Sequence, residues 1–161
     1  IHEAAARASS EDGVKAAHWA RAARVHGVHL ADHEAAIADW EALTELGPSA
    51  TPELYDEALE QLDRHLGALG EHESRLNVLA ERADRARDLR TFLEHTNTLA
   101  ELMLSLEQVD AALTSLRGAA RRGAEEGGPV VLQLRARAID TLTDILVMRG
   151  ELRELNTLLL D

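Results

Sequence analysis

The sequence contains no cysteine, very few aromatic residues and a single lysine, and each shortage excludes a class of protein. Without cysteine there can be no disulfide framework and no thiolate metal site. Aromatic residues make up 2% of the chain, whereas alanine and leucine supply most of its apolar side chains. That balance disfavours a β-sandwich, whose core uses valine, isoleucine, tyrosine and phenylalanine, and favours closely packed helices. We therefore expect an all-α fold.

Long apolar runs and a basic surface are also missing from the sequence. The longest apolar runs fall far short of the ~20 residues that a membrane-spanning helix needs. The net charge is −12, whereas nucleic-acid binding requires a basic face and usually stacking aromatic residues. We therefore expect no nucleic-acid partner and no membrane partner, and we place the protein in the cytoplasm. Because the chain begins at Ile1, we expect it to be a fragment of a longer protein.

Common catalytic motifs are absent as well. Neither His33–Glu34 nor His72–Glu73 is followed by the second histidine of the helical zinc-protease signature. The only lysine, Lys15, follows a valine, whereas a phosphate-binding loop requires a glycine before its lysine. Ser49 lacks the flanking pattern of a nucleophile elbow. These residues alone predict a non-catalytic protein without a cofactor.

Apolar residues recur at three- and four-residue steps in several segments, which is typical of amphipathic helices. The clearest case is the stretch 94–121, where two such stripes flank the short junction Ser105–Glu107. That junction is too short for anything other than an antiparallel helical hairpin. One hairpin buries only part of its apolar surface, so units of this kind are stable when they stack on one another.

Proline, glycine and capping residues divide the chain into hairpins. Gly47–Pro48 ends the first hairpin and Thr51–Pro52 begins the second. We expect Ser10 to cap the first helix, with Val14 and Trp19 on its buried side. The whole chain is predicted to be one domain of four hairpins, which cover residues 11–48, 52–87, 88–122 and 129–161.

The order of small and large residues in these hairpins resembles the tetratricopeptide repeat. The second helix of that family starts with a small residue, which is followed at fixed steps by two apolar residues and a proline. The first hairpin fits all four positions with Ala36, Trp40, Leu43 and Pro48, and the third fits three with Ala112, Leu116 and Ala119. The resemblance implies a right-handed α-solenoid that acts as a scaffold and binds a peptide or a partner's helix in its groove.

Ten positions of this sequence match the groove positions of that family, and most of them are acidic. They are Arg24, Glu57, Glu60, Arg64, Glu94, Asn97, Glu101, Arg137, Asp140 and Asp144. The resemblance therefore implies a mixed, mainly acidic groove for a basic or amphipathic partner. In addition, residues 31–73 contain twelve acidic residues against Arg64 alone. This acidic stretch is either a surface that steers a basic partner or the solvated faces of three helices.

Three further hypotheses are open. The hairpins could be the regulatory or sensor arm of a larger signalling ATPase or transcription regulator, whose chemistry lies outside this chain. Alternatively, His26, His29 and His33 could bind a metal such as zinc, because a turn lets ligands from two helices converge; otherwise they form a histidine-rich connector. Self-association through a final leucine-rich helix that begins at Glu151 is the third hypothesis.

Overall fold

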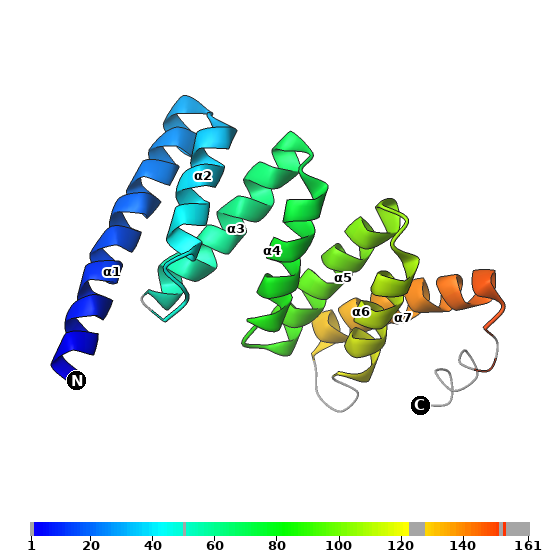
Figure 1. The fold of residues 1–161 in the computed structure, drawn as a ribbon. Helices are drawn as coiled ribbons and strands as arrows, with labels where there is room; N and C mark the ends of the chain where they lie inside the picture. The colour runs from blue at the N-terminus through cyan, green and yellow to red at the C-terminus, as the bar shows by residue number, and fades with distance from the viewer. Residues whose placement is uncertain (1, 50, 123–127, 152, 154–161) are drawn as a thin grey trace. The chain divides into compact units, whose positions relative to one another are not determined.

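The computed structural model of this chain is built from helices (Figure 1). It describes residues 2–49, 51–122, 128–151 and 153, and the side chains from residue 11 onward within those ranges. In this part of the chain there are seven α-helices, one short π-helix and no β-strand. The all-α expectation is therefore confirmed. None of the described helices combines the length and the apolar character needed to cross a membrane.

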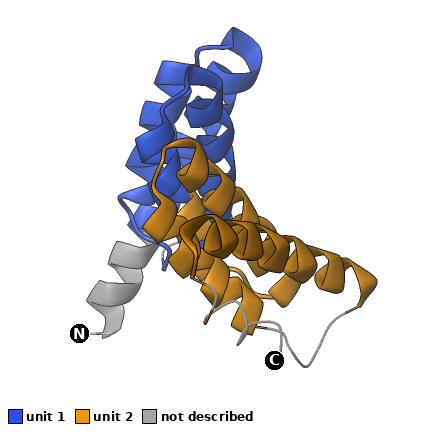
Figure 2. Ribbon diagram, turned by 90° about the vertical axis from the view of Figure 1, so that its right-hand side faces the viewer, with its two compact units in different colours: residues 1–78 blue, residues 79–161 orange. Residues whose placement is uncertain are grey.

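The chain divides into two compact units, which comprise residues 1–78 and 79–161 (Figure 2). The division falls inside one helix, α4 (His72–Asp84). The sequence pattern alone had suggested a single repeat domain and gave no sign of this grouping. Both tryptophans, Trp19 and Trp40, belong to the first unit, so tryptophan fluorescence reports on that unit alone.

The first unit begins with α1 (His2–Arg24), which continues directly into a π-helix, η1 (Val25–Leu30). The helix α2 (His33–Thr44) returns beside them, and α3 (Pro52–Leu69) packs against α2 (Figure 1). Five small alanines let these helices approach closely around larger side chains. The shared core consists of Ala16, Ala20, Ala23, Ala36, Trp40, Leu43, Ala58, Leu62 and Leu66.

The start and the packing face of α1 differ from the sequence prediction. The helix runs unbroken from His2 through Ser10, so Ser10 does not cap it; alanine, glutamate and arginine upstream are strong helix formers that extend it. Val14 is 57% exposed and Trp19 is 40% exposed, whereas Ala16 and Ala20 are fully buried. The predicted buried side was therefore wrong, because α1 turns its smallest residues toward its neighbours instead of its largest ones.

The second unit contains the hairpin that the sequence predicted most clearly. The helices α5 (Leu89–Ser105) and α6 (Val109–Arg121) are antiparallel partners, and α7 (Pro129–Arg149) packs against both. Their core is formed by Leu93, Ala100, Ala112, Leu113, Leu116, Ala119, Ala120, Ala138, Leu142, Ile145 and Leu146. The leucine-rich helix predicted after Glu151 lies outside the described residues, apart from Arg153.

Within the described residues, one type of turn follows η1, α3, α5 and α7. Its central residue has a positive φ: 52° at Ala31, 73° at Gly70, 60° at Glu107 and 71° at Gly150. After Gly70, the Glu71 amide donates to the Leu66 carbonyl at 3.0 Å, and equivalent bonds follow Glu107 and Gly150. After Ala31, which ends the wider π-helix, the Asp32 amide reaches back one residue further, to the His26 carbonyl at 2.9 Å. These bonds satisfy carbonyls that a helix end leaves unpaired. These turns are 39, 37 and 43 residues apart, so the same helix-ending turn recurs about every 40 residues in the described part of the chain.

Candidate interaction site

Six of the ten predicted groove residues already have partners within their own unit. Arg24 binds Glu57, Arg137 binds Glu101 and Arg90 binds Glu94 through side-chain ion pairs. A guanidinium and a carboxylate that neutralise each other have little charge left for a ligand. The remaining groove candidates, Glu60, Arg64, Asp140 and Asp144, are exposed.

Asn97 has a structural role in place of the predicted partner contact. Its side chain is 4% exposed, and its Nδ2 donates to the backbone carbonyl of Leu134 at 3.0 Å. This bond ties α5 to α7 inside the second unit. The resemblance to a family motif indicated a groove residue, but the pattern did not reveal that α7 covers this position.

The three histidines proposed as metal ligands do not converge on one point. His26 places Nδ1 2.6 Å from Oδ2 of Asp39, whereas His33 places Nδ1 2.8 Å from Nδ1 of His65. His29 is exposed. Within the described residues, no group of three or more histidine, aspartate and glutamate side chains is arranged to hold a metal ion.

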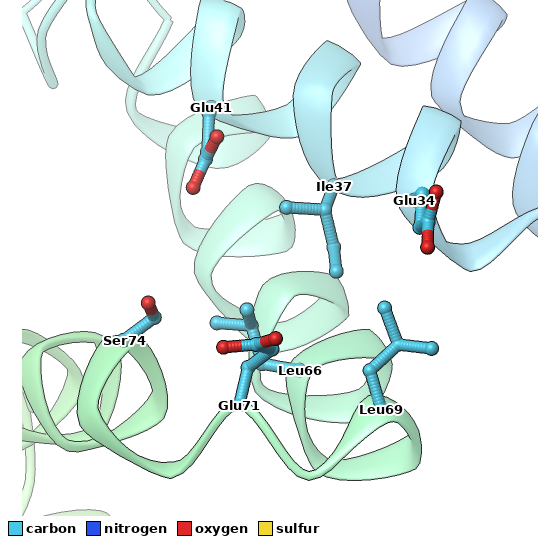
Figure 3. Close-up of a pocket in the computed structure, with 7 residues that line it drawn as sticks. All are labelled: Glu34, Ile37, Glu41, Leu66, Leu69, Glu71 and Ser74. Atoms are coloured by element: carbon cyan, nitrogen blue, oxygen red, sulfur yellow. The ribbon is translucent and has the colours of Figure 1, made fainter.

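A surface pocket of about 300 Å³ lies where α2 faces the α3–α4 turn (Figure 3). Ile37 points from α2 toward Leu66 and Leu69, and these three side chains form an apolar floor (Figure 3). Three carboxylates surround this floor together with one hydroxyl. The polar residues are Glu34, Glu41, Glu71 and Ser74.

Helical spacing explains how the sequence assembles this pocket. Glu34, Ile37 and Glu41 are three and four residues apart, so they share one face of α2. On α3, Leu66 and Leu69 share a face in the last turn. Gly70 then adopts the left-handed conformation that ends α3 and brings the start of α4 back to the pocket.

The carboxylates around the pocket are not neutralised by nearby cations. Among the described residues, none of the Glu34, Glu41 and Glu71 side chains takes part in a hydrogen bond or an ion pair. Arg75, on the first turn of α4, instead donates from Nε to Oδ1 of Asp63 at 2.7 Å. The pocket therefore combines an apolar floor with uncompensated negative charge at its rim.

This pocket was not predicted from the sequence, although the sequence contains a signal for it. The acidic stretch 31–73 includes every rim carboxylate. The pattern on α2 alternates acidic, apolar and acidic residues at positions 34, 37 and 41. What the sequence could not supply was the approach of the α3–α4 turn, which joins Leu66, Leu69 and Glu71 to that stripe.

The fold and this pocket define a helical-hairpin protein with an acid-rimmed apolar site. No family model, no curated protein and no solved structure matches the chain.

Proposed function

We propose that this chain is a non-catalytic protein-interaction module that holds a basic segment of a partner protein in the pocket of α2, α3 and α4. The observation that carries the proposal is the combination of three unpaired carboxylates, Glu34, Glu41 and Glu71, with an apolar floor. The proposal keeps the tetratricopeptide resemblance and its implied right-handed solenoid. It moves the binding site away from the groove residues, because most of those are engaged in pairs.

Lysine and arginine side chains suit such a pocket because each has an aliphatic stem and a cationic head. The stem would lie on Ile37, Leu66 and Leu69, and the head would meet the rim carboxylates. An exposed ion pair contributes only about 0–1 kcal/mol, so charge alone is too weak to hold a partner. The volume, about 300 Å³, is at the lower end for a ligand site and suits one or two side chains. We therefore expect moderate affinity that decreases as salt is added.

Fluorescence anisotropy of labelled peptides tests this function. The probes are an amphipathic arginine- and lysine-rich peptide and a peptide of equal length with glutamate at the basic positions. We expect only the basic peptide to bind, with weaker binding at about 500 mM salt than at about 50 mM. The triple variant E34Q/E41Q/E71Q should lose most of this binding, because glutamine keeps the size of each side chain and removes its charge.

Glu60→Gln is the matched control, since Glu60 is an exposed acid of α3 that does not line the pocket. It should bind the basic peptide like the unmodified chain. If Glu60→Gln weakens binding as much as the triple variant does, binding reflects overall negative charge and not the pocket. If neither peptide binds at low salt, the proposed function is wrong.

A further inference from the structure

Two histidines meet directly beside the pocket. His33 is the first residue of α2 and His65 lies near the end of α3; their Nδ1 atoms are 2.8 Å apart. The ring centroids are 5.1 Å apart, and His65 is only 5% exposed. In the sequence, His33 precedes Glu34 at the pocket rim and His65 precedes Leu66 at its floor. The contact therefore joins the two helices that carry most of the pocket.

The distance between the two Nδ1 atoms limits how many protons they can hold. A hydrogen bond between them requires one ring to donate its Nδ1–H and the other to accept with a bare Nδ1. If both Nδ1 atoms carry protons, no acceptor is left and, once both rings are charged, two cations face each other at close range. The contact is therefore compatible with at most one proton between the two atoms.

The His65 ring also lies against the π-helix at Gly27. A Cβ atom added at Gly27 of η1 would lie 2.7 Å from Cε1 and 2.8 Å from Nε2 of His65. The imidazole is therefore packed against the η1 backbone on one side and against His33 on the other. A second proton on the two histidines would therefore disturb the packing of α2, α3 and η1 at the same time.

The charges that act on His65 are the positive ones of His33 and Arg64, whereas the carboxylate of Glu34, next to His33 in the sequence, lines the pocket. On α2, the Asp32 carboxylate accepts the Ala35 amide at the helix start, and Asp39 binds His26 of η1. On α3, Asp63 is held by Arg75 of α4, while the neighbouring Arg64 adds positive charge. The other η1 histidine, His29, is exposed.

Burial lowers the pKa of His65 below its usual value of 6.5, and the positive charges of His33 and Arg64 lower this pKa further. As the pH falls, the unfolded chain therefore takes up a proton at this position before the folded chain does. The contribution of neutral His65 to the stability of the first unit is therefore fully present above about pH 6.5 and is lost as the pH falls through the lower pKa of the folded state.

We propose that the His33–His65 contact is an acid-sensitive clasp, which shapes the pocket near neutral pH and releases α2 from α3 when both rings are protonated. Binding of a basic partner is then strong at neutral pH and weak in mild acid. The pH dependence of partner binding rests on the proposed function of the pocket. The His33–His65 clasp does not rest on it and can be tested without any partner.

The first experiment follows the histidine rings of the full chain by long-range ¹H–¹⁵N NMR from about pH 8 to about pH 5. We expect His65 to protonate below its usual pKa of 6.5, and urea unfolding followed by tryptophan fluorescence to show stability falling over the same range. In the variant His33→Asn, an amide replaces the Nδ1 partner without adding a charge, so this fall should shrink. His29→Asn is the matched control and should behave like the unmodified chain. If His65 titrates at its usual pKa of 6.5 or above, the clasp does not exist. This outcome can be read from the unmodified chain alone.

The second experiment measures anisotropy of the basic peptide at about pH 7.5 and about pH 5.5 in the presence of EDTA, which removes any bridging metal. We expect roughly tenfold weaker binding at the lower pH for the unmodified chain and for His29→Asn. The loss should be below about threefold for His33→Asn. If binding weakens equally at low pH in all three proteins, the clasp does not control peptide binding. If no peptide binds at either pH while the NMR titration shows the clasp, the proposed function has failed and the clasp stands.

Discussion

Arg24 and Glu57 form a two-point ion pair between α1 and α3: Nε donates to Oε1 at 2.8 Å and Nη2 donates to Oε2 at 2.5 Å. Both residues were predicted to contact a partner in a groove. In the structure they join α1 to α3 within the first unit. An arginine fork matches the two oxygens of a carboxylate, so this geometry is stronger than a single contact.

A double-mutant cycle on Arg24 and Glu57 should give a coupling free energy of about 0.5–1 kcal/mol. The value is small because both side chains remain partly open to water. Urea unfolding followed by tryptophan fluorescence measures it, since both tryptophans belong to the first unit. Neither single alanine variant should change anisotropy of the basic peptide more than twofold. If Arg24→Ala weakens binding of the basic peptide tenfold, Arg24 and Glu57 belong to the binding site.

Replacing Asn97 by aspartate tests the buried bond between α5 and α7. The two side chains have nearly the same shape, but a carboxylate cannot donate to the Leu134 carbonyl, and it brings a charge into a site that is 4% exposed. We expect a loss of about 3 kcal/mol or more, against about 1–3 kcal/mol for Asn97→Ala. Circular dichroism during urea unfolding provides the measurement. Equal stability of Asn97→Asp and the unmodified chain would mean that Asn97 is not buried.

The sequence predicted the helices better than it predicted their surroundings. Thr51–Pro52, Gly70 and Gly150 mark helix ends in the structure as they did in the sequence, because they act through local backbone geometry. The face of α1 was not predictable in this way. Its largest residues, Val14 and Trp19, dominate any apolar pattern, but the choice of packing face depends on how closely α2 and α3 approach.

Neither the π-helix nor the pocket could be predicted from the sequence, because both involve contacts between residues that are far apart in the chain. Nothing in Val25–Leu30 distinguishes a π-helix from an ordinary helix end. The feature that accompanies it, the packing of His65 against Gly27, involves residues 38 positions apart. The rim of the pocket likewise needs Glu71 beside Glu34. The acidic composition of 31–73 predicted that a negative surface exists, whereas only the fold placed it over apolar side chains.

Glu107 is a non-glycine residue in a turn where two of its three counterparts around the chain have the same left-handed conformation at glycine. Its φ of 60° is disfavoured for a residue with a Cβ atom. We therefore expect Glu107→Gly to stabilise the second unit by about 0.5–1 kcal/mol. Gly70→Ala, the reverse change in the first unit, should destabilise by about 1 kcal/mol. Circular dichroism for Glu107→Gly and tryptophan fluorescence for Gly70→Ala measure the two effects; a destabilised Glu107→Gly would show that the side chain, and not the backbone, holds this turn.

Asp88 caps α5, and its cap should make the second unit sensitive to acid. Its carboxylate accepts from the Thr91 amide at 2.9 Å and from the Thr91 hydroxyl at 2.9 Å, and these bonds lower the pKa of Asp88 from its usual 3.8. This contribution to stability is present above the unfolded-state value and is lost as the pH falls through the lower folded value. Asp88→Ser keeps a capping oxygen without a titrating group. Its circular-dichroism unfolding curve should therefore vary less with pH below about 4 than that of the unmodified chain; an unchanged dependence would assign the acid response to other carboxylates.

The packing face of α1 can be tested by comparing a buried alanine with an exposed valine. Ala20 is fully buried between helices, so Ala20→Leu inserts a side chain where no space exists and should destabilise the first unit by about 1–3 kcal/mol. Val14 is 57% exposed, so Val14→Ser should change stability by less than about 0.5 kcal/mol. Urea unfolding followed by tryptophan fluorescence measures both variants in the full chain. The opposite ranking, with Val14→Ser the more damaging change, would mean that α1 buries its large residues as the sequence pattern predicted. The unit would then present alanines to solvent, and the placement of η1 against His65 would change with the rotation of α1.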